Sequence, residues 1–306
     1  MSVTSRLFSL GRELDLAPAA FGELTRSDEC LGEPAELQRR LDGDGYLFIP
    51  GFFEPDLIRG ARAALTDRLA AGGLLDPAFP SIEAKVRAGQ LPPVPVDIAE
   101  NNPALDRVIH GPELLGFYST LFGEAVRHYD FTWLRAVVPG HGSPPHCDLV
   151  YMGRGTHQVL TCWIPYGEVP LELGGLIVLE GSHRQSARLK NYLELDVDRY
   201  CENHPREVAK VKEQGGWSHR HNGSLTYNPV SLRERLGGRW LTTHWRPGDF
   251  ITFKMNVVHA SLDNQTDTIR LSSDTRYQRA SQPADARWVG ANPPGHGVRG
   301  KQGMIC

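Results

Sequence analysis

Three residues in two distant stretches of the chain have the types and spacing of a metal site. His146 and Asp148 are separated by one residue, so in an extended strand their side chains leave the same face about 6–7 Å apart. His259 ends the apolar run that starts at residue 250 and is the third candidate ligand. Two histidines and one carboxylate leave three positions open on an octahedral ion, which is the arrangement of non-haem iron(II) oxygenases. The triad therefore predicts iron(II) chemistry with dioxygen.

A cosubstrate site is predicted from Arg270, which lies 11 positions after His259 on the next extended run. Its guanidinium fork can hold the remote carboxylate of 2-oxoglutarate, while the other end of that molecule chelates the metal. Ser261 lies two residues after His259 and adds a hydroxyl on the same strand face. The alternative role for Arg270 is a surface ion pair with an acidic neighbour, Asp267 or Asp274.

Short strands, separated by glycine and proline, dominate the chain from about residue 126 to 278. Because no long helices alternate with them, they predict a mainly β sandwich or jelly roll and not a parallel α/β sheet. Residues 184–245 are polar and interrupt the series, so we expect an insertion over one end of the sandwich. The strands are expected near Val126–Val138, Leu149–Met152, Gln158–Pro165, Leu176–Leu179, Phe250–Phe253 and Ile269–Tyr277.

The flanking regions have a different texture. In residues 1–125 we expect a short helix, an apolar strand at 46–50 and a longer helix that starts at Pro55 and ends at Gly72. Six prolines make residues 74–103 a loop, and a second helical stretch ends at Gly123. The tail, 281–306, is rich in proline and glycine and is expected to be irregular. We predict one domain over 1–306, with its core at 126–280.

Composition and charge narrow the class of partner. Of 306 residues, 40% are apolar and 23% charged, as in globular proteins with a sizeable core. A formal net charge of −3 supplies no cationic field for nucleic acid or anionic lipid. We see neither an apolar leader nor a run of about 18 apolar residues. We therefore predict a cytoplasmic protein that acts on a small molecule and binds neither nucleic acid nor membrane; the oligomeric state is not indicated.

The five cysteines are an odd number without CxxC spacing, which argues against a disulfide framework or a zinc knot. We expect reduced thiols. Cys147 lies between His146 and Asp148, but in a strand its side chain points to the opposite face, so we interpret it as a buried neutral thiol.

Taken together, the motifs resemble the phytanoyl-CoA dioxygenase family of iron(II)- and 2-oxoglutarate-dependent oxygenases, over about Leu37 to Tyr277. The opening resembles the family in Asp44-Gly45-Tyr46-Leu47-Phe48-Ile49-Pro50-Gly51-Phe52-Phe53. The central motifs are more specific: His146-x-Asp148, Trp163-Ile164-Pro165, the run Gly174-Gly175-Leu176 to Gly181-Ser182-His183, Gly248-Asp249-Phe250, and His259-Ala260-Ser261 with Asn264 and Arg270.

The resemblance implies that His146, Asp148 and His259 bind iron. It also implies that Trp163, Ser261 and Arg270 contact 2-oxoglutarate, and that the core is a cupin-like double-stranded β-helix with flanking helices. The chain departs from the family in two places. Glu180 stands where the family usually has proline before the Gly-Ser-His turn, and the segment 184–245 is long. Since insertions shape substrate pockets, phytanoyl-CoA is not carried over as the substrate.

Further histidines have more ordinary explanations. His183 is expected to form a hydrogen bond at a turn, and His219 and His221 are expected to be solvated and not to form a second metal site. His141 and His157 lie near the ligands, so substrate contact stays open for both. Candidate pocket walls are Trp163, Trp217 and the proline-rich residues 92–95.

The predicted reaction is hydroxylation of a small or medium-sized, partly apolar metabolite, with decarboxylation of 2-oxoglutarate to succinate. Desaturation, ring closure and epimerisation are related outcomes, whereas Asp148 disfavours halogenation, since related halogenases replace this carboxylate by a small residue. Two alternatives are a cupin-like isomerase or hydrolase that uses its metal as a Lewis acid and a non-catalytic 2-oxoglutarate or metal sensor. Arg270 and Ser261 speak against the first, and the complete ligand set against the second.

Overall fold

Two sheets make up the centre of the fold. The computed structural model describes residues 6–87, 98–214 and 221–306. The larger sheet has the order β4-β11-β7-β13-β5, and β6 also pairs with β13. All its pairs are antiparallel. Its strands are β4 (Tyr46–Ile49), β5 (Val126–His128), β6 (Trp133–Val137), β7 (Leu160–Pro165), β11 (Phe250–Lys254) and β13 (Arg270–Arg279).

The smaller sheet has the order β12-β8-β10-β3 and carries one of the candidate ligands. Its strands are β3 (Phe21–Glu23), β8 (Leu176–Leu179), β10 (Trp240–Thr242) and β12 (His259–Ser261). A hairpin of β1 (Phe8–Ser9) and β2 (Arg12–Glu13) attaches to the end of β12, where the Ser9 hydroxyl donates to the Ser261 carbonyl at 2.9 Å. The N-terminal hairpin thus lies beside the strand that carries His259.

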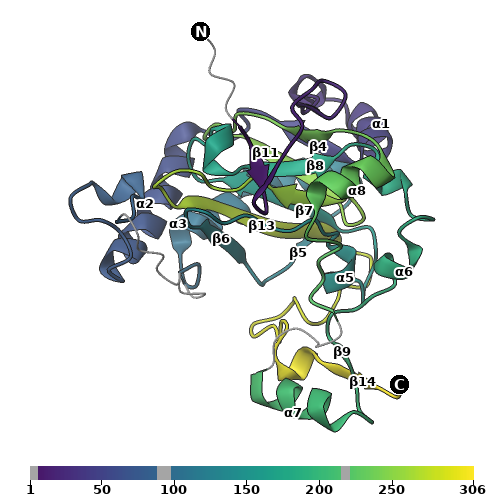
Figure 1. Cartoon of the computed structure of the whole chain (residues 1–306). Coiled ribbons are helices and arrows are strands. Elements are labelled where there is room, and N and C mark those ends of the chain that lie inside the picture. Colours follow the sequence, from purple (N-terminus) through teal and green to yellow (C-terminus); the bar gives the residue numbers. More distant parts are fainter. Residues whose placement is uncertain (1–5, 88–97, 215–220) are drawn as a thin grey trace.

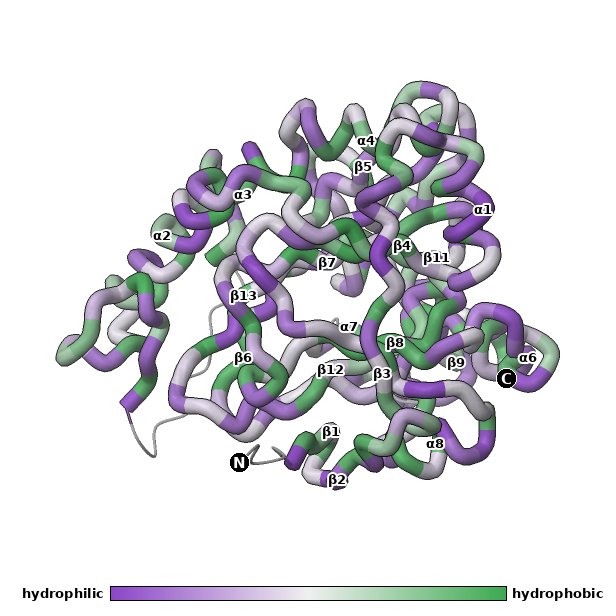
Figure 2. Tube along the Cα trace, turned by 90° about the horizontal axis from the view of Figure 1, so that it is seen from above, coloured by the Kyte–Doolittle hydropathy of each residue, from purple (hydrophilic) through white to green (hydrophobic). Residues whose placement is uncertain are grey.

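The period of two along the strands sorts side chains between two layers. On β7, Cys162 and Ile164 face a core covered by helices. Trp163 faces the smaller sheet, where it packs in one cluster with Phe253 of β11 and Leu176 of β8. Figure 2 shows hydrophobic residues along β7, β8 and β11 inside the fold, whereas the outer helix α1 is mostly hydrophilic. The layer between the sheets is therefore where an inward-facing site can be built.

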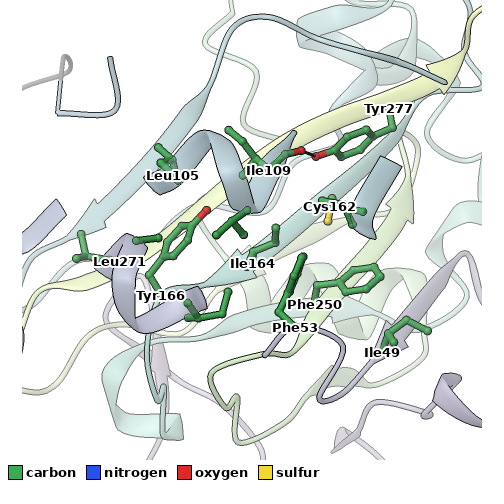
Figure 3. Close-up of a cluster of buried hydrophobic side chains, with 14 of the residues drawn as sticks. Ile49, Phe53, Leu105, Ile109, Cys162, Ile164, Tyr166, Phe250, Leu271 and Tyr277 are labelled. Carbon is green, nitrogen blue, oxygen red and sulfur yellow. Dashed lines mark hydrogen bonds between the residues drawn. The ribbon is translucent and has the colours of Figure 1, made fainter. Parts of the chain in front are cut away.

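Helices cover the outer face of the larger sheet (Figure 1). They begin at prolines, which suit a first turn because they have no N–H to leave unpaired. Figure 3 shows Phe53 and Phe250 packed near Ile164 and the Tyr277 hydroxyl donating to the Ile109 carbonyl. The covering helices are α1 (Pro34–Asp44), α2 (Pro55–Ala71), α3 (Pro103–Ile109) and α4 (Pro112–Phe122).

A lobe beside the sandwich joins the middle of the chain to its C-terminal segment (Figure 1). It contains β9 (Arg199–Cys201), α7 (Pro205–Gln214) and β14 (Gln302–Met304), and β14 pairs parallel with β9. Asp198, fully buried, accepts from Arg287, Lys301 and His296. The remaining helices are α5 (Leu149–Met152), α6 (Lys190–Leu193) and α8 (Pro229–Leu236).

The structure corrects several predicted elements. Residues 149–152, expected as a strand, form helix α5, because Asp148 has helical dihedrals and its carbonyl accepts from Tyr151 and Met152. The strand expected over 126–138 is divided into β5 and β6. The larger sheet also takes β4 from the N-terminal region, and the smaller takes β10 from the expected insertion. The tail, expected to be irregular, contains β14 and the fully buried Trp288.

The expectation of reduced thiols is wrong for two cysteines. Cys201 and Cys306 form a disulfide, with Cα atoms 5.6 Å apart, because the pairing of β14 with β9 brings together residues separated by 105 positions. Cys30, Cys147 and Cys162 are free and buried, as predicted for Cys147. Of the helices in the described residues, none has the length and apolar character needed to cross a bilayer.

Removal of the disulfide by the double substitution C201S/C306S should lower the free energy of unfolding by about 2–4 kcal/mol, because a long closed loop restricts the unfolded chain. Urea unfolding with and without a thiol reductant measures this. The reductant should destabilise the wild type and leave the double variant unchanged. Equal stability of the oxidised wild type and the variant would contradict the expected contribution.

Candidate metal and cosubstrate site

The three predicted ligands converge although they come from two separate segments. The backbones of His146 and His259 form a two-way antiparallel bridge, in which each N–H donates to the other carbonyl at 3.0 Å. This bridge sets the two imidazole centroids 4.1 Å apart. Asp148 enters at the first turn of α5, two residues after His146. The expected regular strand is therefore replaced by a bridge followed by a helical turn.

The ligand atoms are close enough to share one ion. Asp148 Oδ1 lies 3.9 Å from His146 Nε2 and 3.8 Å from His259 Nε2. Among the described residues these three form the one group whose ligand atoms all lie within 4.8 Å of one another. Neutral imidazoles and a carboxylate are suitable donors for iron(II).

Backbone carbonyls fix both imidazole rings. His146 Nδ1 lies 2.8 Å from the Pro144 carbonyl, and His259 Nδ1 lies 3.1 Å from the Val257 carbonyl. A carbonyl only accepts, so Nδ1 carries the proton and Nε2 is left as the lone-pair donor. Burial and the second imidazole lower the pKa of His146 to about 3, and burial lowers the pKa of His259. Both rings are thus neutral and ready to ligate at physiological pH.

Asp148 has two further partners that the sequence did not reveal. Its Oδ2 accepts from the Thr161 hydroxyl and, at 3.0 Å, from Arg276 Nη2. Burial alone would raise the pKa of Asp148, but Arg276 and the two histidines outweigh it and hold the pKa well below its usual range. The signal for Arg276 was available, since it lies six residues after Arg270 and so faces the same side of β13.

Arg270 is buried, which rules out the surface ion pair considered for it. Its Nη1 donates to the Ser272 hydroxyl at 3.0 Å, and its Nε has no hydrogen-bond partner in the described structure. Asp267 pairs with Lys85, and Asp274 with Arg135. Burial lowers the pKa of Arg270 to about 10, so the guanidinium stays charged. A buried cation with an unpaired donor fits an anionic ligand.

The other two predicted cosubstrate residues lie in the same cavity. Trp163 is 5.6 Å from the Arg270 guanidinium, measured to its ring centroid. The Ser261 hydroxyl accepts from the Ser143 N–H at 2.7 Å. The cavity measures about 560 Å³, and both residues line it together with the triad and Arg270. All six predicted site residues therefore surround one space.

The remaining predictions have mixed outcomes. His183 is structural, with Nε2 3.2 Å from the Asp42 carbonyl. His141 and His157 lie near carbonyls of neighbouring loop residues and do not line the cavity of the triad. Asn264 donates to two carbonyls, those of Val137 and Thr268, and so holds a turn. His219, Trp217 and residues 92–95 lie outside the described residues, and the solvation of His221 stays a prediction.

The comparison with known families now decides the class. The profile described as phytanoyl-CoA dioxygenase (PhyH) matches residues 41–272. The chain belongs to the phytanoyl-CoA dioxygenase family. As a member of this family of iron(II)- and 2-oxoglutarate-dependent oxygenases, it is an oxidoreductase that uses iron(II), 2-oxoglutarate and dioxygen. The resemblance and the enzyme class drawn from the motifs are confirmed.

Relatives and solved structures agree with this family. A Streptomyces exfoliatus protein named 1-deoxypentalenic acid 11-beta-hydroxylase is 26% identical over 264 residues, covering 82% of this chain and 83% of that protein. The non-heme alpha ketoglutarate dependent carbocyclase SnoK from nogalamycin biosynthesis matches at a TM-score of 0.56 and 19% identity, covering 86% and 89% of the two chains. The epimerase SnoN, from the same biosynthesis, matches at a TM-score of 0.51 and 20% identity, covering 85% of this chain and 93% of that chain. These likenesses confirm the predicted fold.

In the metal-free protein, the free energy of unfolding should depend on pH, because His146 and His259 are buried as neutral rings. The unfolded chain protonates histidine near pH 6.5, whereas folded His146 resists protonation down to about pH 3. The stability that these neutral rings contribute is therefore fully present above about pH 6.5 and is lost as the pH falls. Urea unfolding of the metal-free protein at several pH values should show a shallower fall for H146Q/H259Q. An equal slope in both proteins would contradict this.

Proposed function

We propose that this enzyme hydroxylates a small or medium-sized metabolite, with His146, Asp148 and His259 as the iron ligands and Arg270 as the anchor of 2-oxoglutarate. One observation carries the proposal: the triad and a buried arginine with an unpaired donor line the same cavity. An isomerase or hydrolase has no need of such a cation for a dicarboxylate. The complete ligand set likewise favours catalysis over sensing.

The protein's part in the reaction is to hold and orient the reactants. When bound, iron(II) would supply the activation of dioxygen that oxidises 2-oxoglutarate to succinate and carbon dioxide and converts a substrate C–H bond to C–OH. Trp163, Phe253 and Leu176 form an apolar wall that keeps water from this part of the cavity. Ser261, tied to the Ser143 N–H, and Trp163 are proposed to position 2-oxoglutarate beside Arg270.

The remaining lining of the cavity supports a partly apolar substrate with polar groups. The apolar side chains there are Phe131, Trp133 and Met152, with Tyr151 adding a ring and a hydroxyl; the polar ones are Arg135, Asn222, Ser224, Tyr227 and His296. The relatives named as 1-deoxypentalenic acid 11-beta-hydroxylases suggest 1-deoxypentalenic acid as the first compound to test. A cytoplasmic location and a single domain stay predictions.

His296 is proposed as a polar contact for the substrate. It lines the cavity of the triad, yet it belongs to the tail, beyond the family-matched residues 41–272. Its Nδ1 lies 2.9 Å from buried Asp198, and its ring meets Trp288 edge to face at 4.7 Å between centroids. These two contacts fix the orientation of the ring.

The role of Arg270 can be tested with two 2-oxo acids. R270M should weaken 2-oxoglutarate binding about 10- to 150-fold, because a charge-assisted hydrogen bond contributes about 1.5–3 kcal/mol. Binding of 2-oxobutyrate, which lacks the remote carboxylate, should be equally weak in both proteins. Succinate and propionate formation with iron(II) and ascorbate measure the preference, and R270K should be intermediate. If R270M still prefers 2-oxoglutarate as strongly as the wild type, Arg270 is not the anchor.

The role of His296 is tested once a metabolite panel that begins with 1-deoxypentalenic acid has identified a substrate. H296A should raise KM for that substrate about 2- to 12-fold, the equivalent of about 0.5–1.5 kcal/mol for one hydrogen bond. Substrate-free succinate formation should not change, since the ring is held by Asp198 and Trp288, which belong to neither the candidate metal site nor the proposed cosubstrate site. An unchanged KM, or an equal loss of substrate-free turnover, would contradict the assignment.

A further inference from the structure

Arg276 is a buried cation that the metal and cosubstrate roles leave without a function. Its guanidinium is 2% exposed and lines the cavity of the triad. Nη2 lies 3.0 Å from Asp148 Oδ2, and Nη1 donates to the Asp274 carbonyl at 2.9 Å. The face of the guanidinium lies 4.2 Å from the Trp133 ring centroid. Arg276 therefore joins a candidate metal ligand to a wall of the substrate space.

The two oxygens of Asp148 have different surroundings. Oδ2 is held by two donors, the Thr161 hydroxyl and Arg276 Nη2. Oδ1 faces the two Nε2 atoms, at 3.8 and 3.9 Å. A carboxylate that rotates freely can chelate an ion with both oxygens and so use an additional coordination position. Fixing Oδ2 prevents that rotation.

We propose that Arg276 is a positioning residue that, with Thr161, restricts Asp148 to ligation through Oδ1. This inference depends on the proposed role of the triad as the iron site. With one oxygen from Asp148 and one nitrogen from each histidine, three positions stay available to 2-oxoglutarate and dioxygen. Loss of Arg276 would free Oδ2 to compete for one of them.

The contacts of Arg276 favour this role over two others. As a substrate anchor it could offer only Nε, which has no hydrogen-bond partner among the described residues, since both Nη atoms and one face already have contacts within the fold. A purely structural role does not account for an ion pair at this place, because a buried pair is often no more stabilising than a well-packed apolar pair. The positioning role accounts for the contact of Arg276 with Oδ2 of the candidate ligand Asp148, which the other two roles do not explain.

Binding measurements under anaerobic conditions test the proposal. R276M should weaken iron(II) binding about 10- to 100-fold, the usual range for a lost partner of a metal ligand. R276K, which keeps the charge but not the fork, should recover part of the affinity. T161V removes the other donor and should have a smaller effect in the same direction. R279M is the matched control, since Arg279 lies on the same strand but pairs with Glu124 away from the site.

A second readout separates positioning from stability. The visible absorption band of the iron(II) complex with 2-oxoglutarate should shift in R276M and require more 2-oxoglutarate to saturate, and both effects should be absent in R279M. Wild-type affinity and spectrum in both R276M and T161V would overturn the proposal. If R276M does not fold, T161V and R276K decide. If instead the H259A variant binds iron(II) as tightly as the wild type does, the proposed metal site itself is overturned.

Discussion

The pair of backbone hydrogen bonds between His146 and His259 is the constraint on which the site depends. Each segment alone offers an imidazole to solvent or core. Once the bridge forms, both rings face the same space, and their Nδ1 atoms meet carbonyls of their own segments. The bridge in turn requires β12 to lie against β8 in the smaller sheet. The convergence of the three candidate ligands is thus a consequence of sheet pairing and not of local sequence alone.

Strand β13 shows how one element serves the core and the site together. Leu271 and Tyr277 face the helices, while Arg270 and Arg276 face the space between the sheets. Burial of two guanidinium groups is costly unless each has an anionic or hydrogen-bonding partner. Arg276 has the carboxylate of Asp148 as its partner, whereas within the described residues Arg270 has a neutral hydrogen-bond partner, the Ser272 hydroxyl, and the ring of Trp163. Arg270 is therefore suited to bind an anion from outside the protein, whereas the charge of Arg276 is already paired with a side chain of the protein.

The motifs led to the triad and to Arg270, which line one cavity, because their combination and spacing match a known chemistry. Alternation along the strand places Arg276 on the same face as Arg270, but the contact between Arg276 and Asp148 depends on how two distant segments pack, which the sequence did not reveal. Residues 149–152 were misassigned because four apolar residues fit a strand or a helical turn equally well. The disulfide depended on a pairing across 105 residues, for which spacing gives no signal.

The cavity is enclosed by both ends of the chain. Leu10 reaches it from the N-terminal hairpin and His296 from the tail, and neither belongs to the family-matched residues 41–272. Both side chains therefore add to the shape of the cavity from outside the segments that carry the candidate ligands. Exchange of the Leu10 or His296 side chain would reshape the space offered to a substrate, whereas loss of the whole hairpin would also remove the Ser9 contact that holds β12.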